Sequence, residues 1–515
     1  MRRSSVLIIA AISCVLFAVA AMRLNPQFSS ALAAQPQSTQ ATPVVAASAP
    51  QSAQLTPVSA TVSSIVKPMD IPSLRTPPSA APGTETYTAK RGESIPAVAH
   101  RYLQKTGYLT SSELAEAIRQ VNGLGSSNIL KNGEQVTIPG ILPAPIVEKT
   151  VSVPKDFEVR AIYLTGVMAA SDHGMRIVRH WREVGGNAVV FDIKDSDGSV
   201  NIPFEHPLLG KHQVYIHDLP KYVHFLHSEN MHAIARVAIF RDERMVVEHP
   251  ELAVQSKKNK QPWRENGKLV WTDSSNAKVQ DYNIALAKFV AQSGADEIQF
   301  DYVRFPAEGD QKDASFVYQT EHEKWQRSDV ITDFLKKAYA ELHPTGVLLS
   351  LDVFGVMAWQ RSVDLSHTGQ DIVGMAKYCD VLSPMIYPSH FFGMDNIEHP
   401  GDAPEHFIGE SMQRFELITK GSGVVIRPWL QAFRWRTKTY SPEYIKVQVA
   451  TAKEKGGIGF LFWNAANDYS KPYEAMPEMR AAKDKFFRGD ELPGVTVKAS
   501  LTPVAIPGPA ENGSH

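Results

Sequence analysis

Cysteine is scarce in this chain of 515 residues, which contains only Cys14 and Cys379. Cys14 lies in an apolar run near the N-terminus, apart from the part of the chain expected to be globular. No intrachain disulfide is therefore expected in the mature protein, and the fold must rely on its hydrophobic core. The composition can supply such a core, because 43% of the residues are hydrophobic and 21% are charged, as in ordinary globular domains.

An excess of either charge is also missing. The chain has 53 basic and 54 acidic side chains and a formal net charge of -1, whereas nucleic-acid-binding proteins usually show a basic patch or excess. No Gly-rich phosphate loop follows the first predicted strand, and no GxSxG motif occurs. The histidines between residues 206 and 227 lack the tight ligand spacing of a metal site. We therefore predict no nucleic-acid partner, no metal and no cofactor.

The first 34 residues have the features of a targeting segment. Two arginines precede an apolar run at 6–22, and an Ala-Leu-Ala sequence at 31–33 resembles a signal-peptidase site. Two interpretations stay open, a cleaved signal peptide and an uncleaved membrane anchor. Both predict an exported protein that is periplasmic, cell-wall associated or extracellular, or held at the membrane by this segment. Residues 35–83 and 489–515, rich in Pro, Ala and other small residues, are predicted to be a disordered linker and tail.

Residues 84–140 have the pattern of a small separate module. A strand-like opening is followed by two stretches of helical spacing, and then by a turn and a closing strand. This βααβ order, the opening YTxxRGES at 87–94, the central Asn122 and the closing ILKxGxxVxIP at 129–139 closely resemble a LysM domain. LysM domains bind N-acetylglucosamine-containing glycans, so the resemblance implies binding to peptidoglycan or a chitin-like polysaccharide. The alternative is a small structural domain without a ligand.

From residue 149 to 488, apolar strand candidates alternate with amphipathic helix candidates. Residues 171–183 and 278–293 are two such helices, with apolar side chains at helical spacing. The eight strand candidates are 159–166, 187–193, 232–240, 296–303, 346–353, 380–387, 424–432 and 457–464. Eight βα units predict an α/β protein with a (β/α)8 TIM barrel, and a doubly wound open sheet is the competing fold.

Polar side chains recur where these strands end, and in a (β/α)8 barrel such ends converge on one mouth that holds the active site. Sugar-cleaving enzymes place two carboxylates there, one of them charged and the other protonated. Asp301 and Asp352 lie at the ends of adjacent predicted strands, so we predict both as catalytic, with Asp352 as general acid and Asp192 in reserve. Rings, amides and charged groups at other strand ends would bind sugars. These predicted substrate-binding residues are Lys194, Arg236, Gln299, Tyr302, Arg304, Tyr387, Gln431, Trp463 and Asn464.

Each carboxylate also has a structural interpretation. Asp301 and Arg304 could form an ion pair at a strand end. Asp192 and Lys194 could do the same, because period two places them on one face of their strand. Asp352 could simply cap the turn that follows it. The prediction of a site rests on the joint occurrence of these residues at strand ends.

The barrel segment resembles a bacterial family of glycoside-hydrolase-like (β/α)8 barrels of unknown substrate, distantly similar to α-amylase-like enzymes. The matching pieces are RAIYLTG, FDIKDSDG, DEIQFDYVRFP, DVFG and PMIYPSH. The α-amylase pattern has an arginine before the fourth-strand aspartate and a glutamate on the fifth strand, whereas here Arg304 follows Asp301 and the fifth strand carries Asp352. The resemblance implies a reaction class and leaves the substrate open.

Together these observations predict an exported glycoside hydrolase that binds a glycan through LysM and cleaves glycosidic bonds with paired carboxylates. Two rival functions use the same features. The first is a catalytically silent glycan-binding protein with a lectin-like barrel, and the second is an envelope scaffold. Carboxylates close enough to flank a sugar bond favour the enzyme, and a mouth plugged by side chains favours the rivals.

Overall fold

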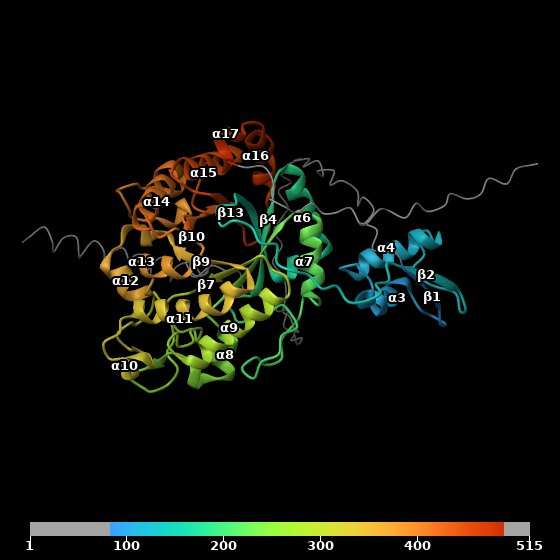
Figure 1. Cartoon of the computed structure of the whole chain (residues 1–515), viewed down its shortest axis with the longest axis horizontal. Coiled ribbons are helices and arrows are strands. Elements are labelled where there is room, and N and C mark those ends of the chain that lie inside the picture. The colour runs from blue at the N-terminus through green and yellow to red at the C-terminus, as the bar shows by residue number, and fades with distance from the viewer. Residues whose placement is uncertain (1–82, 489–515) are drawn as a thin grey trace, which may run out of the picture.

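The computed structural model describes residues 83–488 (Figure 1). The expected targeting segment, nearly all of the expected linker, and the expected tail lie outside these residues. Within the described range, no helix is both long enough and apolar enough to cross a membrane. The described chain forms a small N-terminal unit and a large barrel.

The small unit pairs two antiparallel strands, β1 (Thr84–Thr88) and β2 (Gln135–Pro139), around two helices, α3 (Ile95–Tyr102) and α4 (Ser111–Asn122). Its core is separate from that of the barrel. Asn122 ties α4 to β2, because its side-chain amide donates to the carbonyl of Thr137 at 2.8 Å and accepts from the Thr137 N–H at 2.8 Å.

The barrel consists of eight parallel strands that close on themselves. In chain order they are β3 (Val159–Leu164), β4 (Ala188–Lys194), β5 (His232–Ala238), β7 (Glu297–Asp301), β9 (Leu348–Phe354), β10 (Val381–Met385), the divided seventh strand β11 (Val425–Ile426) and β12 (Trp429–Gln431), and β13 (Gly459–Trp463). Closure follows from the pairing of β10 with β9 on one side and with β11 and β12 on the other. The predicted parallel barrel is confirmed, and the competing open sheet is wrong because no edge is left unpaired.

Helices surround the barrel and cover its outer face (Figure 1). The longer ones are α6 (Asp172–Val184), α7 (Leu219–Ser228), α9 (Ala277–Gln292), α11 (Arg327–Leu342), α14 (Pro404–Ile418), α15 (Pro442–Glu454) and α16 (Ser470–Ala481). Helix α6 shows why they form where they do. Ser171 caps its first turn, Gly185 ends it with φ 108°, and the buried Trp181 donates its indole N–H to the carbonyl of Arg160 at 3.0 Å.

Strand residues alternate between two packed regions, as period two requires. One set faces the helices and belongs to the large core, and the other set, such as Ala161, Val190 and Ile234, forms a second cluster inside the barrel. The barrel interior also holds buried charges near the N-terminal ends of the strands. Glu297 accepts from Arg427 at 2.8 Å and lies 3.1 Å from the His232 ring nitrogen Nε2. Burial opposes ionisation of Glu297, but Arg427 and His232 lower its pKa to about 2.

The small unit contacts the barrel through specific polar groups. The buried Lys221 on α7 donates to the carbonyl of Leu103 at 3.1 Å and to that of Tyr108 at 3.4 Å. Arg179 on α6 lies 3.5 Å from the carboxylate of Glu113 on α4. These contacts hold the unit against the α6 and α7 side of the barrel.

Candidate active site

Three aspartates surround one buried arginine at the carboxyl ends of the barrel strands. Arg236 donates from Nη1 to Asp192 at 2.6 Å, and from Nη2 and Nε to Asp301 at 2.5 and 3.2 Å. Its Nε lies 3.9 Å from Asp352 Oδ2. The side chain of Asp301 is 10% exposed, whereas Asp192 and Asp352 are 1% exposed and Arg236 is fully buried. We call these four residues the aspartate cluster.

Strand register explains why these side chains meet. Asp192 on β4 is paired with Arg236 on β5, which is paired with Gln299 on β7. Phe300 on β7 is paired with Leu351 on β9, so Asp301 and Asp352 follow at neighbouring positions. Their Oδ2 atoms flank the same arginine nitrogen and lie at most about 7 Å apart, the sum of the two distances to it. That bound includes the separation of about 5–5.5 Å typical of retaining glycosidases and the lower end of the range of about 6.5–9.5 Å typical of inverting ones.

The aspartates of the cluster have different electrostatic environments. Burial raises the pKa of Asp352 well above its ordinary value, and the charge on Asp301 raises it further. Burial also raises the pKa of Asp192, against the effect of Arg236 and of the Tyr163 hydroxyl, which donates a hydrogen bond to it. Burial lowers the pKa of Arg236, but the charges of Asp192 and Asp301 outweigh burial and raise it well above its ordinary value. The arrangement therefore favours a proton on Asp352.

Aromatic rings form the wall around the cluster. Tyr163 stacks on Trp463 with ring centroids 4.1 Å apart, and the Arg236 guanidinium lies 5.3 Å from the Trp463 ring centroid. The Trp429 indole N–H donates to Asp352 Oδ1 at 2.6 Å. Tyr387 packs against Phe433 near the same mouth. Tyr163 and Trp429 hold Asp192 and Asp352 in place through hydrogen bonds, and Trp463 and Tyr387 have about 9% and 8% of their surfaces exposed.

The alternative pairing of Asp301 with Arg304 is wrong. Asp301 pairs with Arg236 instead, and the chain turns sharply just after it, because Tyr302 adopts φ 53° and donates its N–H to Asp301 Oδ1 at 2.6 Å. Arg304 is thereby carried onto the face of Phe354, with its guanidinium 4.4 Å from the ring centroid.

The expectation that Lys194 points inward beside Asp192 is also wrong. The pairing of β4 with β5 shifts register between the two residues, and such a bulge reverses the face on which later side chains lie. Lys194 instead forms an ion pair with Asp242 at 2.8 Å and donates to Asn283 at 3.1 Å. Period two alone could not reveal the extra residue.

Three predicted amides contact the protein itself. Gln299 donates to the Ser383 hydroxyl at 3.2 Å, within the barrel. Gln431 donates to the carbonyls of Phe433 and Trp435 at 3.1 and 3.3 Å and so shapes the loop after β12. Asn464 similarly fixes the loop after β13, through the carbonyls of Ala432 and Asp468 at 2.6 and 2.8 Å.

Sequence reasoning missed three residues of the site. Tyr163 and Trp429 bond directly to carboxylates of the cluster, and their strand parity placed both inside the barrel. Asp195 is half-buried just beyond β4, and burial together with the charge of Asp192 raises its pKa to about 7. The segment FDIKDSDG contained that signal, because it places four polar residues directly after an apolar strand.

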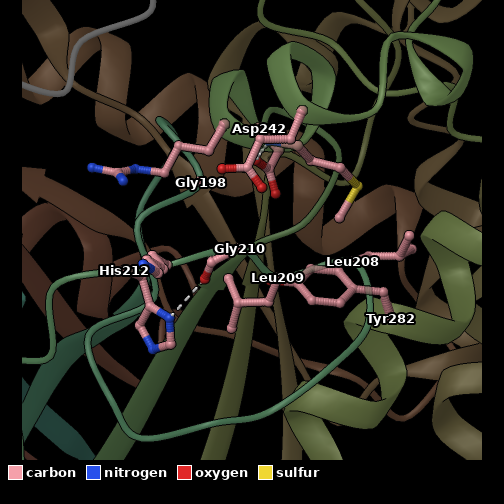
Figure 2. Close-up of a pocket in the computed structure, with 11 residues that line it drawn as sticks. Gly198, Leu208, Leu209, Gly210, His212, Asp242 and Tyr282 are labelled. Atoms are coloured by element: carbon pink, nitrogen blue, oxygen red, sulfur yellow. Dashed lines mark hydrogen bonds between the residues drawn. The ribbon is translucent and has the colours of Figure 1, made fainter.

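A small cavity lies beside this region, between the loop after β4 and helix α8 (Glu243–Glu248). Figure 2 shows Gly198, Leu208, His212, Asp242 and Tyr282 around it. Asp242 is already paired with Lys194, and the His212 ring contacts the carbonyls of Gly210 and Ile202. Within residues 83–488 no group of three or more His, Cys, Asp or Glu side chains is arranged to hold a metal ion.

An eight-stranded parallel barrel with polar residues gathered at the strand ends defines the TIM-barrel class of enzymes and enzyme-like proteins. Residues 161–469 match the family described as "Putative glycosyl hydrolase domain" (DUF4015). This match covers more than half of the chain, and the chain belongs to that family.

Among curated proteins, none matches this chain. Among the solved structures that are similar to parts of it, three serve as examples. A hypothetical protein from Ruminiclostridium thermocellum is 36% identical, with 37% of this chain and 97% of that chain covered and a TM-score of 0.34. The PgaB (BpsB) glycoside hydrolase domain from Bordetella bronchiseptica is 13% identical, with coverages of 65% and 99% and a TM-score of 0.48. The spore cortex-lytic enzyme SleL from Bacillus megaterium is 13% identical, with coverages of 79% and 87% and a TM-score of 0.39.

Proposed function

We propose that this protein is an exported cell-envelope glycoside hydrolase that cleaves O-glycosidic bonds with Asp301 and Asp352. One observation carries the proposal: two adjacent carboxylates at the barrel mouth have different surroundings. Asp301 accepts two hydrogen bonds from the Arg236 guanidinium and is the more exposed of the two, whereas burial favours the protonated form of Asp352. Glycoside hydrolysis needs such a pair, with a charged nucleophile or base and a protonated acid.

The remaining parts of the cluster suit supporting roles. Arg236 holds Asp301 in place through an ion pair, and Asp192 forms a second ion pair with the same guanidinium. Trp429 holds the Asp352 carboxyl through a hydrogen bond to one oxygen, which leaves the other oxygen for the proton. Trp463 and Tyr387 lie at the mouth with about 9% and 8% of their surfaces exposed, so a bound sugar would contact only a small part of each ring.

We further propose that the small unit is a LysM domain that binds an N-acetylglucosamine-containing glycan such as peptidoglycan. The YTxxRGES and ILKxGxxVxIP sequences support this assignment. The contacts of Lys221 and Arg179 with the unit would keep a bound glycan near the barrel, and such tethering raises the local concentration of substrate. The N-terminal sequence supports export, with the segment either cleaved or kept as an anchor.

The experiment is a screen of the purified protein against defined oligosaccharides, with chromatography of the products. We expect cleavage of at least one N-acetylglucosamine-containing oligosaccharide, and loss of cleavage with Asp301→Asn. Binding of such oligosaccharides without any cleavage would contradict the proposal.

A second candidate function, glycan binding without catalysis or a scaffold role in the envelope, is favoured by one observation. Asp352 is only 1% exposed, so a substrate must displace side chains at the mouth to reach it. The same screen separates the candidates, because a silent protein retains binding and yields no new reducing ends.

A further inference from the structure

A second group of polar side chains, beside the aspartate cluster, includes an arginine with no carboxylate partner and two buried N–H groups with no acceptor in the described structure. Arg304 is 6% exposed, and no carboxylate in the described part of the chain lies within ion-pair distance of it. Its one hydrogen bond there runs from Nη1 to the carbonyl of Phe305 at 3.1 Å. A buried guanidinium without an anionic partner is costly to a fold unless the site uses the charge.

Two N–H groups close to Arg304 have no acceptor, although the Nη1 of Arg241 donates to the carbonyl of Ser196 at 2.8 Å. The indole N–H of Trp271 is buried without an acceptor in the described structure, and so is the Nε–H of Arg241. The backbones of Arg241 and Trp271 form an antiparallel bridge. The guanidiniums of Arg304 and Arg241 lie 5.3 and 5.8 Å from the centroid of the same ring, that of Tyr302, and Arg304 lies 4.7 Å from the Trp271 ring. We call Arg241, Trp271 and Arg304 the donor cluster.

The donor cluster lies at the same end of the barrel as Asp301. Arg241 follows β5 and Arg304 follows β7, and Phe354, whose ring supports Arg304, ends β9. Tyr302 links the two clusters, because its N–H donates to Asp301 and its ring centroid lies 5.8 and 5.3 Å from the guanidiniums of Arg241 and Arg304. A sugar bound over Asp301 would therefore have these donors at its side.

We propose that the donor cluster is a subsite for a carboxylate carried by the glycan, so that the substrate is an acidic oligosaccharide. This inference rests on the proposed glycan-cleaving function and names its substrate class. A guanidinium matches a carboxylate in shape and charge and binds it through two parallel hydrogen bonds. The Trp271 N–H and the Arg241 Nε–H add donors with fixed directions.

The charges around the site favour a singly charged carboxylate over a doubly charged phosphate. Burial lowers the pKa of Arg304, and Glu265, Asp301 and Glu308 act on it from beyond ion-pair distance. Burial and the charge of Glu265 raise the pKa of Glu308. The carboxylate of Asp301 at the same end of the barrel reduces the positive potential at Arg304, so one negative charge is a better match than two.

The test uses matched ligands in the full chain carrying Asp352→Asn, so that no ligand is cut during the measurement. Chitotetraose is the neutral ligand, and the peptide-free peptidoglycan tetrasaccharide differs from it by lactyl ether carboxylates on alternate rings. A tetrasaccharide of N-acetylglucosamine and glucuronic acid, with its carboxyl-reduced form, supplies a uronic carboxylate instead. Titration calorimetry gives the preference for each acidic ligand over its neutral counterpart.

We expect a preference of about 10- to 100-fold for at least one acidic ligand, the range for hydrogen bonds to a charged group. The ligand that shows it identifies the source of the carboxylate. Arg304→Gln should abolish the preference and leave neutral binding unchanged, and Arg304→Lys should retain part of it. Arg264→Gln, which removes an exposed arginine outside the cluster, should change nothing.

Trp271→Phe provides a second variant that keeps the ring and removes only the N–H. It should reduce the preference several-fold even if Arg304→Gln fails to fold. Equal affinity of the parent chain for acidic and neutral ligands would overturn the inference. An equal loss of affinity for both ligands in Arg304→Gln, or no binding of either ligand by the parent chain, would overturn it as well. Cleavage of neutral glycans with no preference for acidic ligands would overturn the carboxylate subsite and leave the proposed hydrolase function intact. Binding of acidic ligands that depends on Arg304, without cleavage by wild type, would support the subsite and overturn the hydrolase function.

Discussion

Replacement of Asp352 by asparagine should stabilise the protein and remove its activity. Asparagine resembles a protonated carboxyl, and its side-chain oxygen can still accept the hydrogen bond from Trp429, which measures 2.6 Å in the wild type. The wild-type carboxyl must instead be protonated on folding, because burial and Asp301 raise its pKa. A carboxyl that stays protonated at pH 7, against an unfolded pKa of about 3.9, costs at most about 4 kcal/mol.

The sign of the pH dependence follows from the same shift. A raised pKa means that the folded state binds the proton on Asp352 more tightly than the unfolded state does. The stability that this proton contributes is therefore fully present below the unfolded pKa and is lost as the pH rises toward the folded pKa. The stability advantage of Asp352→Asn should therefore be near zero at pH 4 and grow by about 1.4 kcal/mol for each pH unit above it. It should stop growing once the pH passes the folded pKa.

Urea unfolding followed by tryptophan fluorescence at several pH values measures this difference. Asp281→Asn, on the exposed face of α9, is the matched control and should show no such slope. A difference between Asp352→Asn and wild type that does not change between pH 4 and pH 7 would refute the reasoning. So would a variant that is less stable than wild type at pH 7.

Three further outcomes are expected. Glu297→Gln should destabilise the fold by about 3–5 kcal/mol at neutral pH, because it leaves Arg427 buried without its partner. The difference in unfolding free energy from wild type should shrink below the ordinary carboxyl pKa of about 4.3, because the stabilisation is lost as the pH falls through the Glu297 pKa of about 2. A constant difference down to pH 2 would contradict this. Burial and Asp192 raise the pKa of Asp195 to about 7, and its ionisation adds a negative charge beside Asp192. Asp195→Asn should therefore remove any change in turnover centred near pH 7 and leave the limb set by Asp352, and a change near pH 7 that persists would assign it to another group. The segment 83–142, which has its own core, should sediment with insoluble peptidoglycan or chitin, and its retention in the supernatant with both would make the unit structural.

The fold was largely predictable because its signals are local. Each barrel strand alternates between the helix-facing core and the interior cluster, so apolar runs between helical stretches placed every strand start within two residues of its observed position. The division of the seventh strand at Pro428 follows from the N–H that proline lacks.

The site was predictable only in part, because its partners meet across strands. Asp301, Asp352, Asp192 and Arg236 each have the right parity, but the register that gathers three carboxylates around one guanidinium is a property of the closed sheet. Two local irregularities of the backbone made the directions of Lys194 and Arg304 unpredictable from strand periodicity. A bulge turned Lys194 outward, and the left-handed Tyr302 carried Arg304 away from Asp301.

Catalysis by Asp301 is tested by comparing the turnover of Asp301→Asn with that of wild type on the oligosaccharide that the screen identifies. We predict a normally folded variant that binds the glycan and cleaves it about 10²- to 10⁴-fold more slowly, as expected when a positioned catalytic carboxylate is lost. Turnover within a few-fold of wild type would show that Asp301 is not catalytic, because the bonds would then be cut without the carboxylate that Arg236 holds at the mouth.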